Sequence, residues 1–486
     1  MKRSWYLLVV AICVAFGLRV LLLIDATSLW SDELYSVGKS FQPSFSALLT
    51  MLRDDTHPPG YYALLWVWGH LVGQTPVTLR LLSWLAYLAG GLVMIRQAVA
   101  LGHARPTVAP VAALLAFCSA YPIRFAIEGK SYAVLVLLLA LAWWWRRSGH
   151  PIAYGAVAGL AGLTHFYGLF LVLATAAWDG WKQRWSLACA AMVGALPSLA
   201  WMTYASEYLF SSRAGSWIGG PDFALFEDTL ARGIGVWPLP KLGLILLLVI
   251  VLKRWGGLRG WRWPEAALLD RSGLTPSLLM VVGVVTVSFV KPMTFSRYFV
   301  VLLPAVVPVL AVFITQFKLN TIGRNCSIAV LSLLLISWWG QSFSELDSGE
   351  SRIREDDQFS LISQQTRGQM HRFSSRSKLL NLSDAMEASM GRISHKQTKW
   401  NDEKDLAQLL SQTSKPDQLW LAESGPPKSS EEKLVSMLQL TVKNGYQCEK
   451  RSRSTNALIL ECERIRQADE EIRTLDPLLG KEMLYH

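Results

Sequence analysis

The stretch SLWSDELYSVGKSFQPSFSALLTMLRDDTHPPGYY, from Ser28 to Tyr62, follows directly on the first long apolar run of the chain. It contains two acidic pairs, Asp32–Glu33 and Asp54–Asp55, and then His57 followed by two prolines. Only 13 acidic residues precede residue 341, and five of them fall between residues 25 and 55. Because ionisable groups at a membrane edge are costly, their concentration here predicts a functional site.

The composition is that of a membrane protein with a polar C-terminal region. Of the 486 residues, 52% are hydrophobic, and the 21 tryptophans suit a membrane–water interface. Before residue 341 there are 26 basic and 13 acidic residues, whereas the remainder is nearly neutral, with 21 basic and 23 acidic. A basic excess beside membrane spans reflects topology and anionic lipid headgroups, so no nucleic-acid partner is expected.

Apolar runs of spanning or near-spanning length recur along the first 340 residues and predict about eleven transmembrane helices. The first run is long enough to cross the membrane and is followed by no small-residue cleavage site, so we interpret it as a retained span and not a signal peptide. The runs are 5–24, 78–100, 107–122, 131–146, 151–164, 166–178, 186–204, 240–252, 275–290, 297–316 and 325–340.

The distribution of basic residues sets the expected orientation. The apolar run 61–73 has only 13 residues and suits the interface better than a full span. With that run excluded, most basic loops fall on one side together with the amino end, which the positive-inside rule assigns to the cytoplasm. We therefore expect the first outer loop, residues 25–77, and the C-terminal domain to lie outside the cytoplasm. Residues 213–221 are expected to form a flexible outer loop able to act as a lid.

Residues 341–465 are expected to form a small extracytoplasmic α/β or α+β domain. A strand is predicted at 417–421 and a hairpin from 445–449 and 457–463, with helices near 353–364 and 401–412. Cys448 and Cys462 are placed almost symmetrically about the hairpin turn, which leaves both a cross-strand disulfide and two unpaired thiols open. Residues 466–486 fit neither pattern and are expected to be an unstructured tail.

The expected outer face carries a set of polar residues with two possible interpretations. A carboxylate such as Asp32 can remove a proton from an acceptor hydroxyl or amine, while cations hold a departing phosphate. The alternative for each is structural: a solvated acidic pair, a rigid His-Pro-Pro turn at His57, an ordinary ion pair at Glu128 and Lys130, a packed His165, or an arginine at 297 that extends to the interface.

An ordered series of motifs over residues 1–340 favours the catalytic interpretation. The order is W-x-D-E-x-x-S at 30–36, H-P-P-x-Y-Y at 57–62, R-L-L-S at 80–83, E-G-K-S-Y at 128–132, T-H-F-Y at 164–167 and S-R-Y at 296–298. This series resembles the GT-C superfamily of polyprenyl-phosphate-sugar-dependent membrane glycosyltransferases. The resemblance is closest to the branch of the protein O-mannosyltransferases, the lipid A aminoarabinose transferases and the RgtA/B/C/D-type enzymes.

The resemblance implies an all-α polytopic bundle of GT-C type that transfers a sugar, with inversion, from a lipid-linked phosphate on the non-cytoplasmic face. It implies Asp32 as general base, with Glu33 assisting it. It implies that the remaining motif residues bind substrate or the donor phosphate: His57, Glu128, Lys130, Tyr132, His165, Arg297 and Tyr298. Lys130 stands where the family has arginine and cannot form a bidentate fork. Metal use differs among these enzymes, so a divalent ion held by Asp32, His57 and Glu128 is left open.

The expected partners are the lipid bilayer, a polyprenyl-phosphate-linked sugar, with undecaprenyl-phosphate hexose or pentose favoured by the resemblance, and a glycan, lipid or protein acceptor. The expected location is the plasma (inner) membrane. A transporter or flippase is a second hypothesis, but it favours inverted repeats and mid-span charges, which this sequence lacks. A non-catalytic membrane protein is a third. The sequence does not identify the sugar, the acceptor or the oligomeric state.

Overall fold

The computed structural model describes residues 3–25, 28–103, 105–118, 120–211, 215, 218–229, 264–316, 321–348, 358–393, 399–425, 427–451 and 457–465. The chain divides into two compact units. The first comprises residues 1–25, 39–73 and 77–347, and the second comprises 26–38, 74–76 and 348–486. The boundary between them falls inside helix α2 (Ser31–Ser40).

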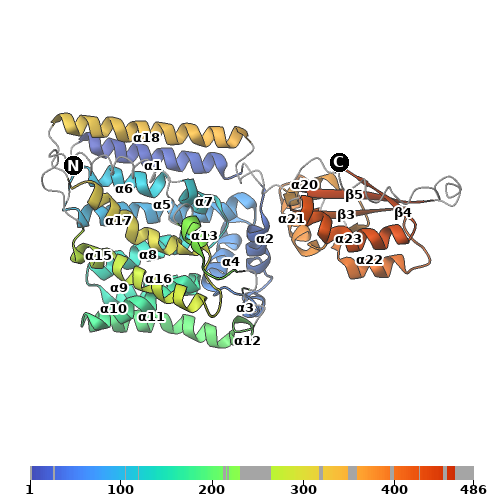
Figure 1. Ribbon diagram of the computed structural model, residues 1–486, viewed down its shortest axis with the longest axis horizontal. Coiled ribbons are helices and arrows are strands. Elements are labelled where there is room, and N and C mark those ends of the chain that lie inside the picture. The colour runs from blue at the N-terminus through green and yellow to red at the C-terminus, as the bar shows by residue number, and fades with distance from the viewer. Residues whose placement is uncertain are drawn as a thin grey trace. The chain divides into compact units, whose positions relative to one another are not determined.

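The first unit is helical throughout the part that the structure describes (Figure 1). Its elements are α1 (Arg3–Leu23), α3 (Phe45–Arg53), α4 (Gly60–Val72), α5 (Pro76–Leu101), α6 (Val108–Phe117), α7 (Ala120–Ile127), α8 (Tyr132–Arg147), α9 (Pro151–Thr164), α10 (Phe166–Trp181), α11 (Trp185–Tyr204), α12 (Ser206–Leu209), α13 (Phe223–Asp228), α15 (Ala266–Ser272), α16 (Leu274–Ser288), the 3₁₀ helix η2 (Ser296–Leu302), α17 (Leu303–Ile314) and α18 (Thr321–Ser348). Ser44 caps α3 by accepting a hydrogen bond from the backbone N–H of Ala47, as the sequence predicts.

Four of the described helical segments are long and apolar enough to cross a membrane, and a bent pair would be a fifth. The four are Arg3–Leu23, Pro76–Leu101, Trp185–Tyr204 and Ser296–Ile314, and the pair α15–α16 is bent by 75°. Several predicted spans correspond to shorter apolar helices, such as α6 and α9. The predicted span 240–252 and much of the predicted lid lie outside the described residues.

One predicted span differs from the observed helices for an identifiable reason, whereas the run 275–290 corresponds to α16. The run 107–122 is not one helix, because α6 ends at Phe117 and α7 begins at Ala120. Pro122 has no backbone N–H to continue the hydrogen-bond ladder of α6, and a proline is tolerated in the first turn of the next helix. The break between α15 and α16 occurs at Gly273, whose φ of +88° is a left-handed conformation that favours glycine.

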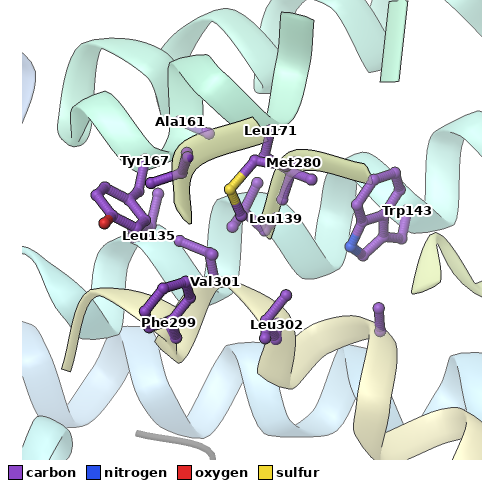
Figure 2. Packing of buried hydrophobic residues seen from close by; sticks show 12 residues of the cluster. Leu135, Leu139, Trp143, Ala161, Tyr167, Leu171, Met280, Phe299, Val301 and Leu302 are labelled. Atoms are coloured by element: carbon purple, nitrogen blue, oxygen red, sulfur yellow. The ribbon is translucent and has the colours of Figure 1, made fainter. Parts of the chain in front are cut away.

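The packing around α8, α10 and α16 determines where the polar residues of the first unit come together. A buried cluster joins Leu135 and Trp143 of α8, Leu171 of α10, Met280 of α16 and Val301 of η2 (Figure 2). Tyr167, at the start of α10, belongs to the same cluster, so it links this apolar core to the polar residues described below. Close van der Waals packing holds these helices at fixed spacing, because lipid tails are as apolar as the core and provide no hydrophobic driving force between helices.

The second unit contains a mixed five-stranded sheet with strand order β2-β1-β3-β5-β4. Its strands are β1 (Arg372–Phe373), β2 (Trp400–Asn401), β3 (Gln418–Ser424), β4 (Tyr446–Lys450) and β5 (Ala457–Arg464), and its helices are α20 (Gln358–Gln365), α21 (Ser377–Ser389), α22 (Glu403–Leu410) and α23 (Pro427–Lys443). Strands β2, β1 and β3 are parallel, whereas β5 is antiparallel to both β3 and β4. Figure 1 shows α22 and α23 along one face of this sheet.

The predicted hairpin is confirmed, because β4 and β5 pair antiparallel with Cys448 directly opposite Cys462. The structure joins these two cysteines in a disulfide, which decides between the alternatives that the sequence leaves open. The predicted strand at 417–421 corresponds to β3, and the two predicted helices correspond to α20 and α22. Helices α21 and α23 were not predicted, although α23 buries Leu434 and Met437, three residues apart, against the sheet.

The N-terminal part of α2 belongs to the same unit as the sheet. A Cβ atom on Gly38 would lie 2.9 Å from a methyl group of Leu382, so the absence of a side chain at Gly38 allows α21 to approach α2 closely. The helix that carries Asp32 and Glu33 is therefore supported by the C-terminal domain.

Candidate functional site

The acidic pair that the sequence singles out occupies the first turn of α2. The Asp32 backbone carbonyl accepts a hydrogen bond from Ser36 Oγ at 3.1 Å. Glu33 is fully buried, and its carboxylate accepts from the backbone N–H of Trp30 at 3.4 Å, as the third-position acid of a capping box does. Glu33 thus stabilises the start of the helix that presents Asp32. Both belong to the second unit, whereas the cluster described next belongs to the first.

Two charged side chains, Lys39 and Asp55, hold His57 in the turn before α4. Asp55 Oδ1 is 2.8 Å from His57 Nδ1, and Asp55 Oδ2 is 2.6 Å from Lys39 Nζ. Burial lowers the pKa of His57, and Lys39 and Lys130 lower it further, against the opposing effect of Asp55. Burial alone would raise the pKa of Asp55, but His57 and Lys39 together hold it well below its usual range. The ring is therefore neutral and the carboxylate ionised at pH 7.

The short loop between α7 and α8 supplies a buried anion and a buried cation. Glu128 and Lys130 are 5% and 6% exposed, and Arg124 of α7 donates a hydrogen bond to the Glu128 carboxylate. Tyr132, 2% exposed, begins α8. Because Arg124 neutralises Glu128, the adjacent ammonium of Lys130 contributes net positive charge to this part of the site.

His165 lies between α9 and α10 and brings the sequence motifs together. Its Nδ1 accepts a hydrogen bond from the backbone N–H of Tyr167 at 3.1 Å, which caps α10. Its ring centroid is 5.9 Å from that of His57, 6.0 Å from Tyr132 and 5.1 Å from Tyr298. Burial lowers its pKa well below the usual value, and the positive charges of Lys130 and Arg297 act in the same direction, as does His57.

The first unit therefore brings His57, Lys130, Tyr132, His165, Arg297 and Tyr298 into one cluster, which we call the histidine cluster. Arg297 and Tyr298 reach it from η2, where the Arg297 guanidinium also lies 4.8 Å from the Phe295 ring. Tyr167 joins the cluster to the chain near α16, because its hydroxyl donates to the backbone carbonyl of Met293 at 2.9 Å.

A cavity of about 170 Å³ opens beside the histidine cluster. His57, His165 and Tyr298 form one part of its lining, and Lys291 contributes a cation. The rest is mostly apolar and comes from α10, α11 and the segments near residues 210, 218 and 292. A mostly apolar lining with a few polar groups is the usual form of a binding site for a small ligand.

The described residues contain no group of ligands arranged for a metal ion. No three of their His, Cys, Asp or Glu side chains gather closely enough to hold one. Glu128 instead pairs with Arg124, and Asp55 occupies one nitrogen of His57. We therefore assign no step of the chemistry to a metal.

Three residues with no specific role predicted from the sequence are in direct contact with predicted site residues in the structure, and one of them, Asp55, was singled out only as half of an acidic pair. Asp55 and Lys39 orient His57, and Arg124 neutralises Glu128. A local signal existed for two of these, because Asp55 is two residues from His57 and Arg124 is four residues before Glu128 on a helix. Lys39 carried no such signal, since its partner lies in the next segment of the loop.

Comparison with known proteins shows the fold. No protein-family model and no curated protein sequence matches the chain. The crystal structure of ArnT from Cupriavidus metallidurans in the apo state superposes with a TM-score of 0.61 at 14% sequence identity, covering 94% of this chain and 97% of that one. The structure of the same protein bound to undecaprenyl phosphate gives a TM-score of 0.57 at 14% identity, covering 95% and 98%. This chain therefore has a fold similar to that of ArnT over nearly its whole length.

Proposed function

We propose, from this shared fold and the histidine cluster, that the chain is an integral membrane glycosyltransferase. It moves a sugar from a polyprenyl-phosphate donor to a hydroxyl or amine acceptor on the non-cytoplasmic face, with inversion. The observation that carries the proposal is an apolar cavity lined by His57, His165 and Lys291. Lys130 and Arg297 lie near enough to His165 for their charges to lower its pKa, and ArnT, which has a similar fold, binds undecaprenyl phosphate. Such a donor needs cations for its phosphate and an apolar surface for its lipid.

In this proposal the reaction is a single displacement at the anomeric carbon. The acceptor oxygen or nitrogen forms a bond to that carbon while the bond to the phosphate oxygen breaks and the lipid phosphate leaves with the electron pair. Asp32 takes the proton of the acceptor, and Glu33 keeps the first turn of α2 in place. Lys130 and Arg297 stabilise the charge that develops on the departing phosphate.

The disulfide between Cys448 and Cys462 supports an extracytoplasmic position for the C-terminal domain, because disulfides persist in oxidising compartments. The basic excess of the opposite loops supports a cytoplasmic amino end. The plasma (inner) membrane and an undecaprenyl-phosphate hexose or pentose are the proposed location and donor.

The proposal is tested with the purified full-length protein in nanodiscs. Wild type should bind undecaprenyl phosphate and release it from a radiolabelled undecaprenyl-phosphate sugar when an envelope acceptor fraction is supplied. The Asp32→Asn variant should keep binding and lose transfer by at least a hundredfold, which is the lower range for general-base catalysis. Asp54→Asn is the matched control, because it removes an exposed acid from the same loop. Transfer by Asp32→Asn at the wild-type rate would remove the base role, and failure of wild type to bind the lipid phosphate would refute the proposed function.

A further inference from the structure

The two histidines of the cluster are fixed in opposite tautomers. A carboxylate can only accept hydrogen bonds, so the 2.8 Å contact with Asp55 Oδ1 places the proton of His57 on Nδ1. In the neutral ring, Nε2 then carries a lone pair. Among the described residues that lone pair has no hydrogen-bond partner, and His57 lines the cavity. His57 therefore offers the cavity an acceptor.

His165 has the reverse arrangement. Its Nδ1 accepts the backbone N–H of Tyr167, so the proton of the neutral ring is on Nε2. His165 is only 5% exposed, and no described residue accepts a hydrogen bond from its Nε2. A buried donor without a partner is costly, so such groups are satisfied by something else, a ligand or a water. His165 also lines the cavity and therefore offers it a donor.

A hydroxyl group satisfies this pair, whereas a phosphate does not. A hydroxyl has one proton to donate to His57 Nε2 and lone pairs to accept from His165 Nε2–H. An ionised phosphate oxygen has no proton, so it would meet the lone pair of His57 with a repulsive contact. The rings are 5.9 Å apart between centroids and nearly perpendicular, at 77°. Tyr298, which also lines the cavity, lies against His165 and offers an aromatic face to the C–H groups of a sugar ring.

We propose that His57 and His165 together bind a hydroxyl group of the transferred sugar, and that Asp55 and Lys39 are positioning residues that hold His57 in the required tautomer. This inference rests on the proposed function and divides the cluster into two parts. Lys130 and Arg297 bind the phosphate, and the two imidazoles bind the glycosyl group. Because burial and the neighbouring cations lower the pKa of both rings, they stay neutral at pH 7 and keep these roles.

The Asp55→Asn variant tests the positioning role directly. The Asp55 carboxylate accepts hydrogen bonds from Lys39 Nζ, from the backbone N–H of His57 and from His57 Nδ1–H. The amide of asparagine has no charge and only one acceptor oxygen for these three donors. The variant therefore loses the anionic acceptor that keeps the proton of His57 on Nδ1, so the tautomer with the proton on Nε2 gains population and the acceptor that His57 offers the cavity is weakened. The variant keeps the size of the side chain, and Asp54→Asn is the control for the loss of one negative charge in the loop.

The measurement compares two ligands, undecaprenyl phosphate and an undecaprenyl-phosphate hexose, with each variant of the full-length protein in nanodiscs. Asp55→Asn should weaken binding of the sugar-loaded lipid about 10- to 100-fold, as expected for a buried hydrogen bond left unmade. Its affinity for undecaprenyl phosphate should change by less than about twofold, and ¹⁵N NMR of histidine-labelled protein should report the altered tautomer. His165→Asn should act in the same way, since asparagine can still cap α10.

The outcomes separate this inference from the proposed function. If wild type binds neither ligand, the proposed function fails and the inference fails with it. If wild type binds both and the variants weaken both equally, the histidines bind phosphate and the inference is wrong. If the variants leave both affinities unchanged, the histidines have no substrate role and the inference is again wrong. Selective loss of affinity for the sugar-loaded lipid, together with the tautomer change in Asp55→Asn, supports it.

Discussion

Replacing Arg146 with methionine should destabilise the helical unit more than the same change at Arg184, its neighbour in one ion-pair network. Arg146, at the end of α8, forms two hydrogen bonds with Asp179 of α10, from Nε at 2.9 Å and from Nη2 at 2.7 Å. The two side chains are 2% and 0% exposed. Arg146 Nη2 also contacts Asp270 of α15 at 3.0 Å, so one guanidinium connects three helices.

The expected loss follows from what the substitution leaves behind. Removing one partner of a buried ion pair costs about 3–5 kcal/mol, because the remaining charge stays buried. Arg184 still lies 3.1 Å from Asp179, so we expect the lower end, about 3 kcal/mol. Arg184→Met is the matched comparison. Its side chain is 31% exposed and its loss leaves the Arg146 pair intact, so we expect about 1 kcal/mol or less.

The assay is unfolding of the purified protein by SDS in mixed micelles, followed by tryptophan fluorescence. A double variant, Arg146→Met with Asp179→Leu, removes both buried charges and should recover most of the loss, since an apolar replacement of a buried pair is often close to neutral. Arg184 keeps its contact with Asp270 in that variant. The reasoning is refuted if Arg146→Met costs no more than Arg184→Met, or if the double variant is as unstable as Arg146→Met alone.

Three further predictions concern the site, the C-terminal domain and helix packing. Only the neutral form of His57 accepts a hydrogen bond, so binding of the sugar-loaded lipid should be lost as the pH falls through the lowered pKa of His57. Because the charge of Lys39 lowers that pKa, the Lys39→Met variant should lose binding at a higher pH than wild type. Loss of binding at the same or a lower pH would contradict the assignment of His57 as the acceptor. Replacing both cysteines of the β4–β5 disulfide, which are 14 residues apart, should reduce the free energy of unfolding of the C-terminal domain by about 3 kcal/mol, the value expected from loop-closure entropy. The change is measured as protease resistance, and equal resistance of the wild type and the variant would contradict the prediction. Gly159→Ala places a Cβ 2.6 Å from a backbone carbonyl oxygen of α11 and should cost about 1–3 kcal/mol in the SDS assay, whereas Gly283→Ala meets nothing within 4 Å and should cost nothing.

Local sequence patterns determined the elements of this protein well where apolar runs are long or alternate cleanly. The runs 151–164 and 186–204 correspond almost residue for residue to α9 and α11, and the β4–β5 hairpin forms where it was predicted. An apolar run and a polar turn act through neighbouring residues, so their effect can be predicted from the sequence alone. Breaks between helices that follow closely on one another were harder, since the run 107–122 was predicted as one span but α6 ends at Phe117 and α7 begins at Ala120.

What the sequence by itself determined is therefore a set of apolar helices and an ordered series of polar residues at their ends. Only the tertiary structure decided that His57 and His165, more than a hundred residues apart, have their rings 5.9 Å apart and face one cavity. The tautomer of each ring depends on which partner occupies its Nδ1, a carboxylate for His57 and a backbone N–H for His165. Such contacts depend on how α4, α8, α10 and η2 pack, and packing is a property of many distant residues together.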